Sequence, residues 1–128
     1  RRLGAACASA LAMGALATNV LLKNLVHRIR PYVELENLSI LVSEPSDWSF
    51  PSGHATASFA AAWALFRLAP KKVGAPALLL AILIALSRLY VGVHYPTDVL
   101  AGAAIGILSG ESSVRLIRSQ RVSRLFEK

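Results

Sequence analysis

Three short segments hold nearly all the side chains of this 128-residue chain that could take part in chemistry. They supply cations, imidazoles, a carboxylate and small residues that expose backbone amides, and they are KNLVHRIRP at 23–31, FPSGHATASF at 50–59 and ALSRLYVGVHYPTD at 85–98. Cations and backbone amides bind phosphate oxygens, whereas an imidazole can attack phosphorus or donate a proton. If the three segments meet in space, they predict a site for a phosphoryl group.

The first segment carries Lys23 and Arg30, seven residues apart and just before Pro31. Seven residues is close to two helical turns, so we expect both cations on one face of a helix that Pro31 stops. Standing alone, the two cations could equally be interfacial residues that extend their charged ends out of the acyl chains.

The second segment has small residues before an apolar helical run. Ser52 is expected to cap this helix, and Gly53 would let the backbone approach a ligand closely. Free amides at a helix N-terminus form an anion site, and His54 would lie in its first turn. An ordinary capped helix with an interfacial histidine explains the same residues.

The third segment places a cation, a turn and a histidine between two apolar runs. Arg88 closes one helix, Gly92 allows a turn, and Pro96 suits the first position of the next helix. Asp98 would then lie in the first turn, where it could accept a hydrogen bond from His94 and leave the other imidazole nitrogen free to attack. Alternatively, Asp98 is only a helix cap.

The elements that must position these residues are membrane helices. The chain is 55% hydrophobic and only 16% charged, whereas a soluble domain carries about 25% charged residues. Residues 3–22 are free of charge and long enough to cross a bilayer, and shorter apolar runs follow at 55–66, 73–86 and 99–108. We therefore predict a single all-α integral-membrane bundle over residues 1–128 with about four transmembrane helices. Because the chain begins with Arg1, we expect it to be incomplete at the N-terminus.

The charges predict the orientation of this bundle. Four alternating spans place ten of the fourteen basic residues on one side and leave the other side with Lys23, Arg28, Arg30 and Arg88. The positive-inside rule then assigns the termini, the turn at 70–74 and a basic tail at 111–128 to the cytoplasm. The loop at 32–50 and the three segments would lie on the extracytoplasmic side of the cell membrane.

Other interpretations of the composition are less consistent with the sequence. Residues 1–22 could be a signal peptide, but the later runs are also membrane-like and no cleavage site precedes Lys23. No nucleic-acid partner is expected, since the basic tail lacks interleaved aromatic residues. Cys7, the single cysteine, excludes a disulfide framework and is best explained as a small buried residue.

KNLVHRIRP, PSGH at 51–54 and SRLYVGVH at 87–94, in this order, resemble the three signature motifs of the type 2 phosphatidic acid phosphatase superfamily. That family also includes glucose-6-phosphatases and vanadium haloperoxidases. Membrane members of the family usually have six helices, so the resemblance implies that two precede this chain. It also implies a metal-independent enzyme without a cofactor.

The resemblance implies a role for each matching residue. His94 would attack phosphorus and form a phosphohistidine, Asp98 would orient it, and His54 would protonate the leaving oxygen. The phosphate would be held by five residues: Lys23, Arg30, Ser52, Gly53 and Arg88. His27 and Arg28 occupy positions that the family leaves free, and we expect them to contact solvent or headgroups.

We therefore expect a lipid phosphatase that acts on undecaprenyl diphosphate, phosphatidate or phosphatidylglycerophosphate, with an oligomeric state that the sequence does not specify. A vanadate-dependent haloperoxidase would use the same anion pocket, although those relatives are soluble. A catalytically silent lipid-binding protein is the third possibility. Two further residue patterns concern packing and membrane contact: Trp48 is expected as an interfacial anchor, and Gly102, Gly106 and Gly110 as a smooth helix face for packing.

Overall fold

The computed structural model describes the backbone of residues 1–126 and the side chains of residues 1–120. Every regular element in this part of the chain is helical, which confirms the all-α prediction. The elements are α1 (Arg2–Ala15), the π-helical segment η1 (Leu16–Leu22), α2 (Lys23–Val26), α3 (Pro31–Glu34), α4 (Gly53–Leu68), α5 (Lys71–Tyr90) and α6 (Pro96–Phe126).

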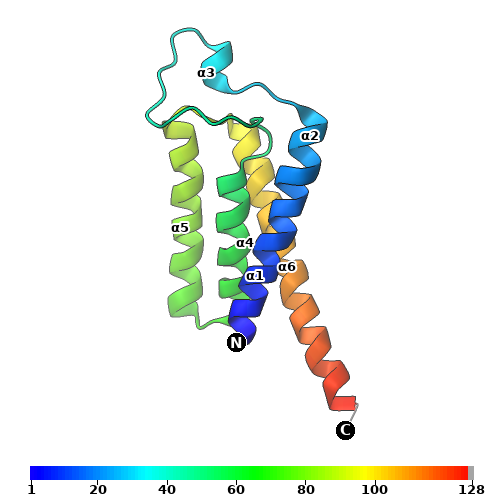
Figure 1. Cartoon of the computed structure of the whole chain (residues 1–128). Helices are drawn as coiled ribbons and strands as arrows, with labels where there is room; N and C mark the ends of the chain where they lie inside the picture. Colours follow the sequence, from blue (N-terminus) through cyan, green and yellow to red (C-terminus); the bar gives the residue numbers. More distant parts are fainter. Residues whose placement is uncertain (127–128) are drawn as a thin grey trace.

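Helix α4 is at the centre of the bundle and packs against α1, α5 and α6. Segments α1, η1 and α2 follow one another without a break, as Figure 1 shows, and α3 lies with the long loop at one end of the bundle. The N-terminus, the α4–α5 turn and the end of α6 lie at the opposite end (Figure 1). This arrangement brings the three sequence segments together at the loop end.

The core consists mainly of small side chains, which allow the helices to approach closely. One buried cluster joins α1, α4 and α6, and its members are Ala6, Ala10, Ala60, Ala64 and Val114. Gly102, Gly106 and Gly110 face α4, and a Cβ atom at Gly106 would lie 2.5 Å from the carbonyl oxygen of Thr56. The packing role predicted for this glycine face is therefore confirmed.

Three segments are long and apolar enough to cross a membrane: Arg2–Glu34, Lys71–Tyr90 and Pro96–Gln120. Helix α4 has 16 residues and spans about 24 Å at about 1.5 Å per residue, which is less than the roughly 30 Å hydrocarbon core. Four helices pack together, and three of the described segments meet the length and composition expected of a span, against the predicted number of about four. Large apolar side chains on α5, such as Leu79 and Leu83, are exposed as lipid contact requires.

Helix α6 is much longer than the apolar run 99–108 that predicted it. The helix continues from Pro96 to Phe126, so the segment expected as a basic tail from residue 111 begins inside a helix. Ser113 and Val114 are buried in the bundle. The last two residues of the predicted tail, 127–128, lie outside the described residues.

The expected helix through Arg30 is wrong, because the helix ends at Val26. His27 adopts a left-handed conformation with φ of 50° and closes α2. Arg30 is extended, as the residue before a proline usually must be, and Pro31 begins the short helix α3 instead of stopping a longer one. Lys23 and Arg30 therefore reach the same region from a helix and from an extended segment.

Candidate active site

A cavity of about 370 Å³ opens at the loop end of the bundle. Helices α4 and α5, segments η1 and α2, and the loops around them contribute its walls. The lining residues are Asn19, Lys23, Arg30, Pro45, Asp47, Gly53, His54, Ala57, Arg88, Val93 and His94. Six of the eight predicted site residues therefore border one cavity, and the other two, Ser52 and Asp98, lie behind its wall.

Ser52 supports the pocket from behind. It is fully buried, and its hydroxyl accepts a hydrogen bond from the backbone N–H of Ala55 at 3.3 Å, as expected of an N-cap. Its own N–H donates to the carbonyl oxygen of Asp98 at 3.0 Å. These two bonds fix the start of α4 against the start of α6, and thus the positions of Gly53 and His54 relative to His94.

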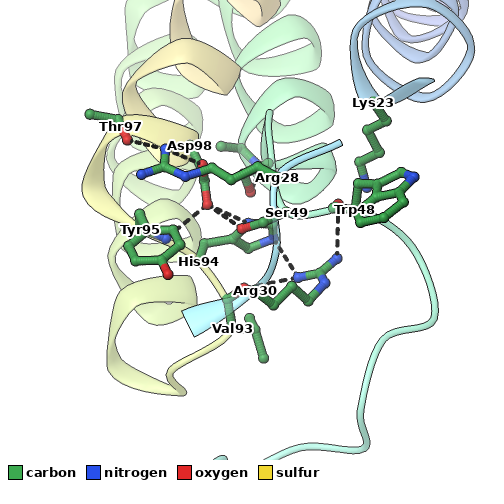
Figure 2. A network of polar contacts seen from close by, with 12 residues as sticks. Lys23, Arg28, Arg30, Trp48, Ser49, Val93, His94, Tyr95, Thr97 and Asp98 are labelled. Atoms are coloured by element: carbon green, nitrogen blue, oxygen red, sulfur yellow. Dashed lines mark hydrogen bonds and ion pairs between the residues drawn. The ribbon is translucent and has the colours of Figure 1, made fainter. Parts of the chain in front are cut away.

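His94 lies between a carboxylate and a guanidinium (Figure 2). Its Nδ1 atom is 3.4 Å from Oδ2 of Asp98, and Nη1 of Arg30 is 3.3 Å from its Nε2 atom. Because a guanidinium only donates, Nε2 must be the acceptor, which leaves the proton on Nδ1 facing Asp98. At this distance Nδ1 is a buried nitrogen without a hydrogen-bond partner among the described residues. The Nε2 lone pair thus faces Arg30, and both side chains border the pocket.

Asp98 is fully buried and held by several donors. The backbone N–H of Tyr95 donates to Oδ2 at 2.8 Å, and the hydroxyl of Ser49 donates to the same oxygen. Nη1 of Arg28 forms an ion pair with Oδ1 at 3.0 Å. A buried carboxylate requires such partners, and together they fix the oxygen that faces His94.

The expectation that Arg28 contacts only solvent or headgroups is therefore wrong. Besides Asp98, its guanidinium contacts the hydroxyl of Thr97 at 2.5 Å and lies 4.1 Å from the centroid of the Tyr95 ring. The sequence does indicate a cationic partner for Asp98, because a carboxylate next to an apolar run needs one. The sequence does not say which of the four nearby cations it is.

Lys23 and Arg30 both bind Asp47, a residue of the loop at 32–50. Both cations are almost fully buried, at 6% and 5% exposure. Asp47 accepts a hydrogen bond from Lys23 through Oδ2 and one from Nη2 of Arg30 through Oδ1 at 2.6 Å. The carbonyl oxygen of Asp47 also accepts from Nε of Arg30 at 2.9 Å. No residue pattern distinguishes Asp47 from the three glutamates of the same loop.

The loop makes two further contacts near the site. His27 packs against Trp48 with ring centroids 5.0 Å apart, and Trp48 remains 41% exposed. Asn19 of η1 is another lining residue that the sequence analysis missed. It precedes Lys23 by one π-helical turn, and the N–H of Lys23 bonds to the carbonyl oxygen of Thr18, so the wider turn places both side chains toward the pocket.

His54 and Arg88 complete the opposite side of the pocket. Partial burial lowers the pKa of His54 below its usual value, and the positive charges of Arg88, Lys23 and Arg30 act in the same direction. Arg88 makes one long hydrogen bond, to the hydroxyl of Ser87 at 3.4 Å, and has no ion pair with any described acidic residue. This side of the pocket is strongly positive and would attract an anion.

The described residues contain no group of three His, Cys, Asp or Glu side chains that could hold a metal ion. The functional groups of the pocket are instead cations, imidazoles and helix-start amides. Such groups bind a phosphoryl group and stabilise the charge that develops on its oxygens during transfer. One imidazole has a carboxylate behind it, as an activated nucleophile requires.

Comparison with known proteins gives a consistent result. The sequence model of the PAP2 superfamily matches residues 3–121. A decaprenylphosphoryl-5-phosphoribose phosphatase of Mycobacterium tuberculosis is 43% identical over 104 residues, which cover 80% of this chain and 55% of that protein. An undecaprenyl-diphosphatase of Sulfolobus acidocaldarius is 37% identical over 84 residues, which cover 66% of this chain and 41% of that protein. The chain thus spans about half the length of these relatives.

A similar fold is present in a solved structure. The crystal structure of LpxE from Aquifex aeolicus superimposes with a TM-score of 0.80 and 33% sequence identity. The alignment covers 88% of this chain and 67% of that one.

Proposed function

Since the chain belongs to the PAP2 superfamily, we propose that it forms the catalytic part of a multi-pass membrane enzyme that removes phosphate from a lipid through His94. The observation that carries the proposal is the single cavity bordered by three cations and two histidines. The contact from Asp98 to the far side of His94 adds the activation that a nucleophile needs.

In the first step Nε2 of His94 attacks phosphorus in line with the leaving oxygen. An N–P bond forms, the bond from phosphorus to the lipid oxygen breaks, and His54 transfers its proton to that oxygen. Asp98 stabilises the positive charge that grows on the His94 ring. For a diphosphate, the leaving group is the lipid monophosphate.

In the second step water attacks the phosphohistidine. His54, now neutral, takes a proton from the water, and the N–P bond breaks to release inorganic phosphate. Phosphomonoesters hydrolyse very slowly without a catalyst, and one acid–base group contributes only about 10²- to 10⁴-fold. Lys23, Arg30, Arg88 and the amide of Gly53 therefore supply most of the stabilisation of the equatorial oxygens.

The substrate class follows from the site's position and from the relatives. The pocket lies at the ends of membrane-length helices. The phosphate groups found at that level of the membrane are those of lipid headgroups. Two of the similar proteins named above are a decaprenylphosphoryl-5-phosphoribose phosphatase and an undecaprenyl-diphosphatase. We therefore favour a polyprenyl phosphate or diphosphate over phosphatidate and phosphatidylglycerophosphate.

The proposed orientation places this pocket on the extracytoplasmic side and the termini in the cytoplasm. The argument is the positive-inside rule. Arg1, Arg2, Arg67 and Arg118 border a second cavity at the end remote from the pocket. The N-terminus and the end of α6 lie at that same end (Figure 1).

Phosphate release by the purified full-length protein in detergent tests the function. Undecaprenyl diphosphate, undecaprenyl phosphate, phosphatidate and phosphatidylglycerophosphate are compared with EDTA present. We expect release from the polyprenyl substrates at the highest kcat/KM. No release from any of the four lipids would contradict the proposal.

A further inference from the structure

Asp47 lines the pocket and contacts two of its three cations. Its two carboxylate oxygens contact different cations, Oδ2 that of Lys23 and Oδ1 that of Arg30. The same two cations, with Arg88, are those that the proposed function assigns to the phosphate. A carboxylate that bridges two cations makes the same contacts as two oxygens of a phosphoryl group.

The burial of the partners explains why an anion is needed there. The side chains of Lys23 and Arg30 are only 7% and 5% exposed, whereas that of Asp47 is 51% exposed. Buried cations without a counter-charge are costly. Partial burial by itself would raise the pKa of Asp47, but the hydrogen bonds from Lys23 and Arg30 outweigh it and hold the pKa below its usual value. Asp47 is thus a permanent anion at working pH.

The location of Asp47 allows it to leave the pocket. It belongs to the irregular segment between α3 and α4, where no described residue from 35 to 52 is helical. Its half-exposed carboxylate can move into water at little desolvation cost. The cations, by contrast, are buried: Lys23 belongs to α2, and Arg30 also donates to the carbonyl oxygen of Val93 at 2.9 Å.

We infer that Asp47 is an internal ligand of the phosphate pocket, which an incoming phosphate must displace from Lys23 and Arg30. The substrate first meets Arg88 and His54, which have no anionic partner among the described residues. Its phosphate oxygens then replace the Asp47 carboxylate on the two buried cations. Asp47 therefore sets how tightly the pocket holds any anion, including the phosphate product.

The expected size of the effect follows from the competition. An anion that binds only when Asp47 has left shows an apparent Kd equal to its intrinsic Kd divided by the fraction of pockets that Asp47 has vacated. If Asp47 occupies the cations about 90% of the time, its neutralisation tightens binding about tenfold. The free energy needed to displace Asp47 does not depend on which anion binds. It should therefore weaken the binding of phosphate and of sulfate by similar factors.

The test is the binding of inorganic phosphate and of sulfate to Asp47→Asn in the full-length protein in detergent, measured by calorimetry at constant ionic strength. Asparagine keeps the shape and removes the charge, and Asp47→Ala removes both. The matched control is Glu44→Gln, which makes the same charge change on the same loop at an exposed residue. We expect about tenfold tighter binding of both anions in the two Asp47 variants and a change below twofold in the control.

Thermal unfolding provides a second measurement that needs no turnover. The Asp47 variants should be less stable than the wild type in anion-free buffer and should gain a larger increase in Tm from added phosphate, since binding to the folded state stabilises it. Unchanged or weaker phosphate binding in Asp47→Asn would overturn the inference. So would equal tightening in Glu44→Gln, because the cause would then be the general charge of the loop.

The inference rests on the proposed function for the identity of the ligand, but the two fail separately. Tighter phosphate binding without lipid hydrolysis would support Asp47 as the internal ligand and contradict the phosphatase. Lipid hydrolysis without tighter binding would support the phosphatase and contradict the internal ligand.

Discussion

His54 and His94 border the same pocket in different surroundings. His94 is 6% exposed and lies between Asp98 and Arg30, whereas His54 is exposed in the first turn of α4, where partial burial and the charges of Arg88, Lys23 and Arg30 lower its pKa. The carboxylate suits His94 to carry positive charge after attack. The low pKa suits His54 to lose a proton readily. These differences support the assignment of nucleophile and general acid, respectively.

The His54→Ala variant tests the general acid. A lipid alkoxide is a poor leaving group and needs a proton, so turnover of the lipid should fall about 10²- to 10⁴-fold. An aryl phosphate has a good leaving group and should lose far less. The measurement is kcat/KM for both substrates, and equal losses would contradict the role.

The pH dependence of kcat/KM tests the proton that His54 donates. A general acid works only when protonated, and the pKa of His54 in the free protein lies below its usual 6.5. Hence kcat/KM for the lipid should fall as pH rises, beginning below pH 6.5. This decline should be absent from the residual activity of His54→Ala. A lipid profile that rises throughout this range in the wild type would count against His54.

Arg28 is the positioning residue that we expect to matter most outside the pocket. In Arg28→Gln the buried Asp98 loses its ion pair at Oδ1, so its carboxylate orients His94 less firmly. We predict a fall in kcat of roughly 10- to 100-fold, the range known for partners that orient metal ligands. KM should stay within about twofold, because Arg28 does not line the cavity. Arg28→Lys should recover part of the loss, and a change in KM alone would disprove the role.

At the scale of elements, the sequence predicted the starts of helices better than their ends. Ser52 and Pro96 mark the starts of α4 and α6 because capping and proline effects are local. Gly92 forms the predicted turn with φ of 80°. The end of α2 was missed because His27 enters the left-handed region, which a residue other than glycine seldom does. The position where α2 ends depends on tertiary contacts, which no local sequence pattern encodes.

The glycine face of α6 makes a prediction at this scale. Gly106→Ala would place a Cβ atom 2.5 Å from the carbonyl oxygen of Thr56 and should destabilise the bundle by about 1–3 kcal/mol, as overpacking does. The control is Gly4→Ala in α1, where no atom lies within 4 Å of the new Cβ. Thermal unfolding in detergent measures both. Equal Tm values for the two variants would mean that α6 and α4 are not in close contact.

At the scale of the whole molecule, the sequence predicted which cations gather but not what they bind. The three segments meet at one end because alternating helices return there, a consequence of topology that hydropathy reveals. The pairing of Arg28 with Asp98, and of Asp47 with Lys23 and Arg30, depends on the path of an irregular loop. No periodicity encodes that path, so these contacts required the structure.

The proposed orientation can be tested on intact cells with single cysteines in a Cys7→Ser background. Glu36→Cys lies in the loop at the pocket end, and Lys72→Cys lies near the α4–α5 turn at the opposite end. A membrane-impermeant maleimide should label position 36 and leave position 72 unlabelled until the cells are opened. The reverse pattern would place the pocket in the cytoplasm.

The account as a whole depends on His94 as the nucleophile, and trapping the covalent intermediate tests it most directly. The full-length protein is mixed with substrate, quenched in alkali within one turnover and digested, and the peptides are analysed by mass spectrometry. The account predicts one phosphate on His94 in the wild type, and neither label nor turnover in a folded His94→Ala variant. Turnover retained in that variant, or a phosphate on another residue, would contradict it.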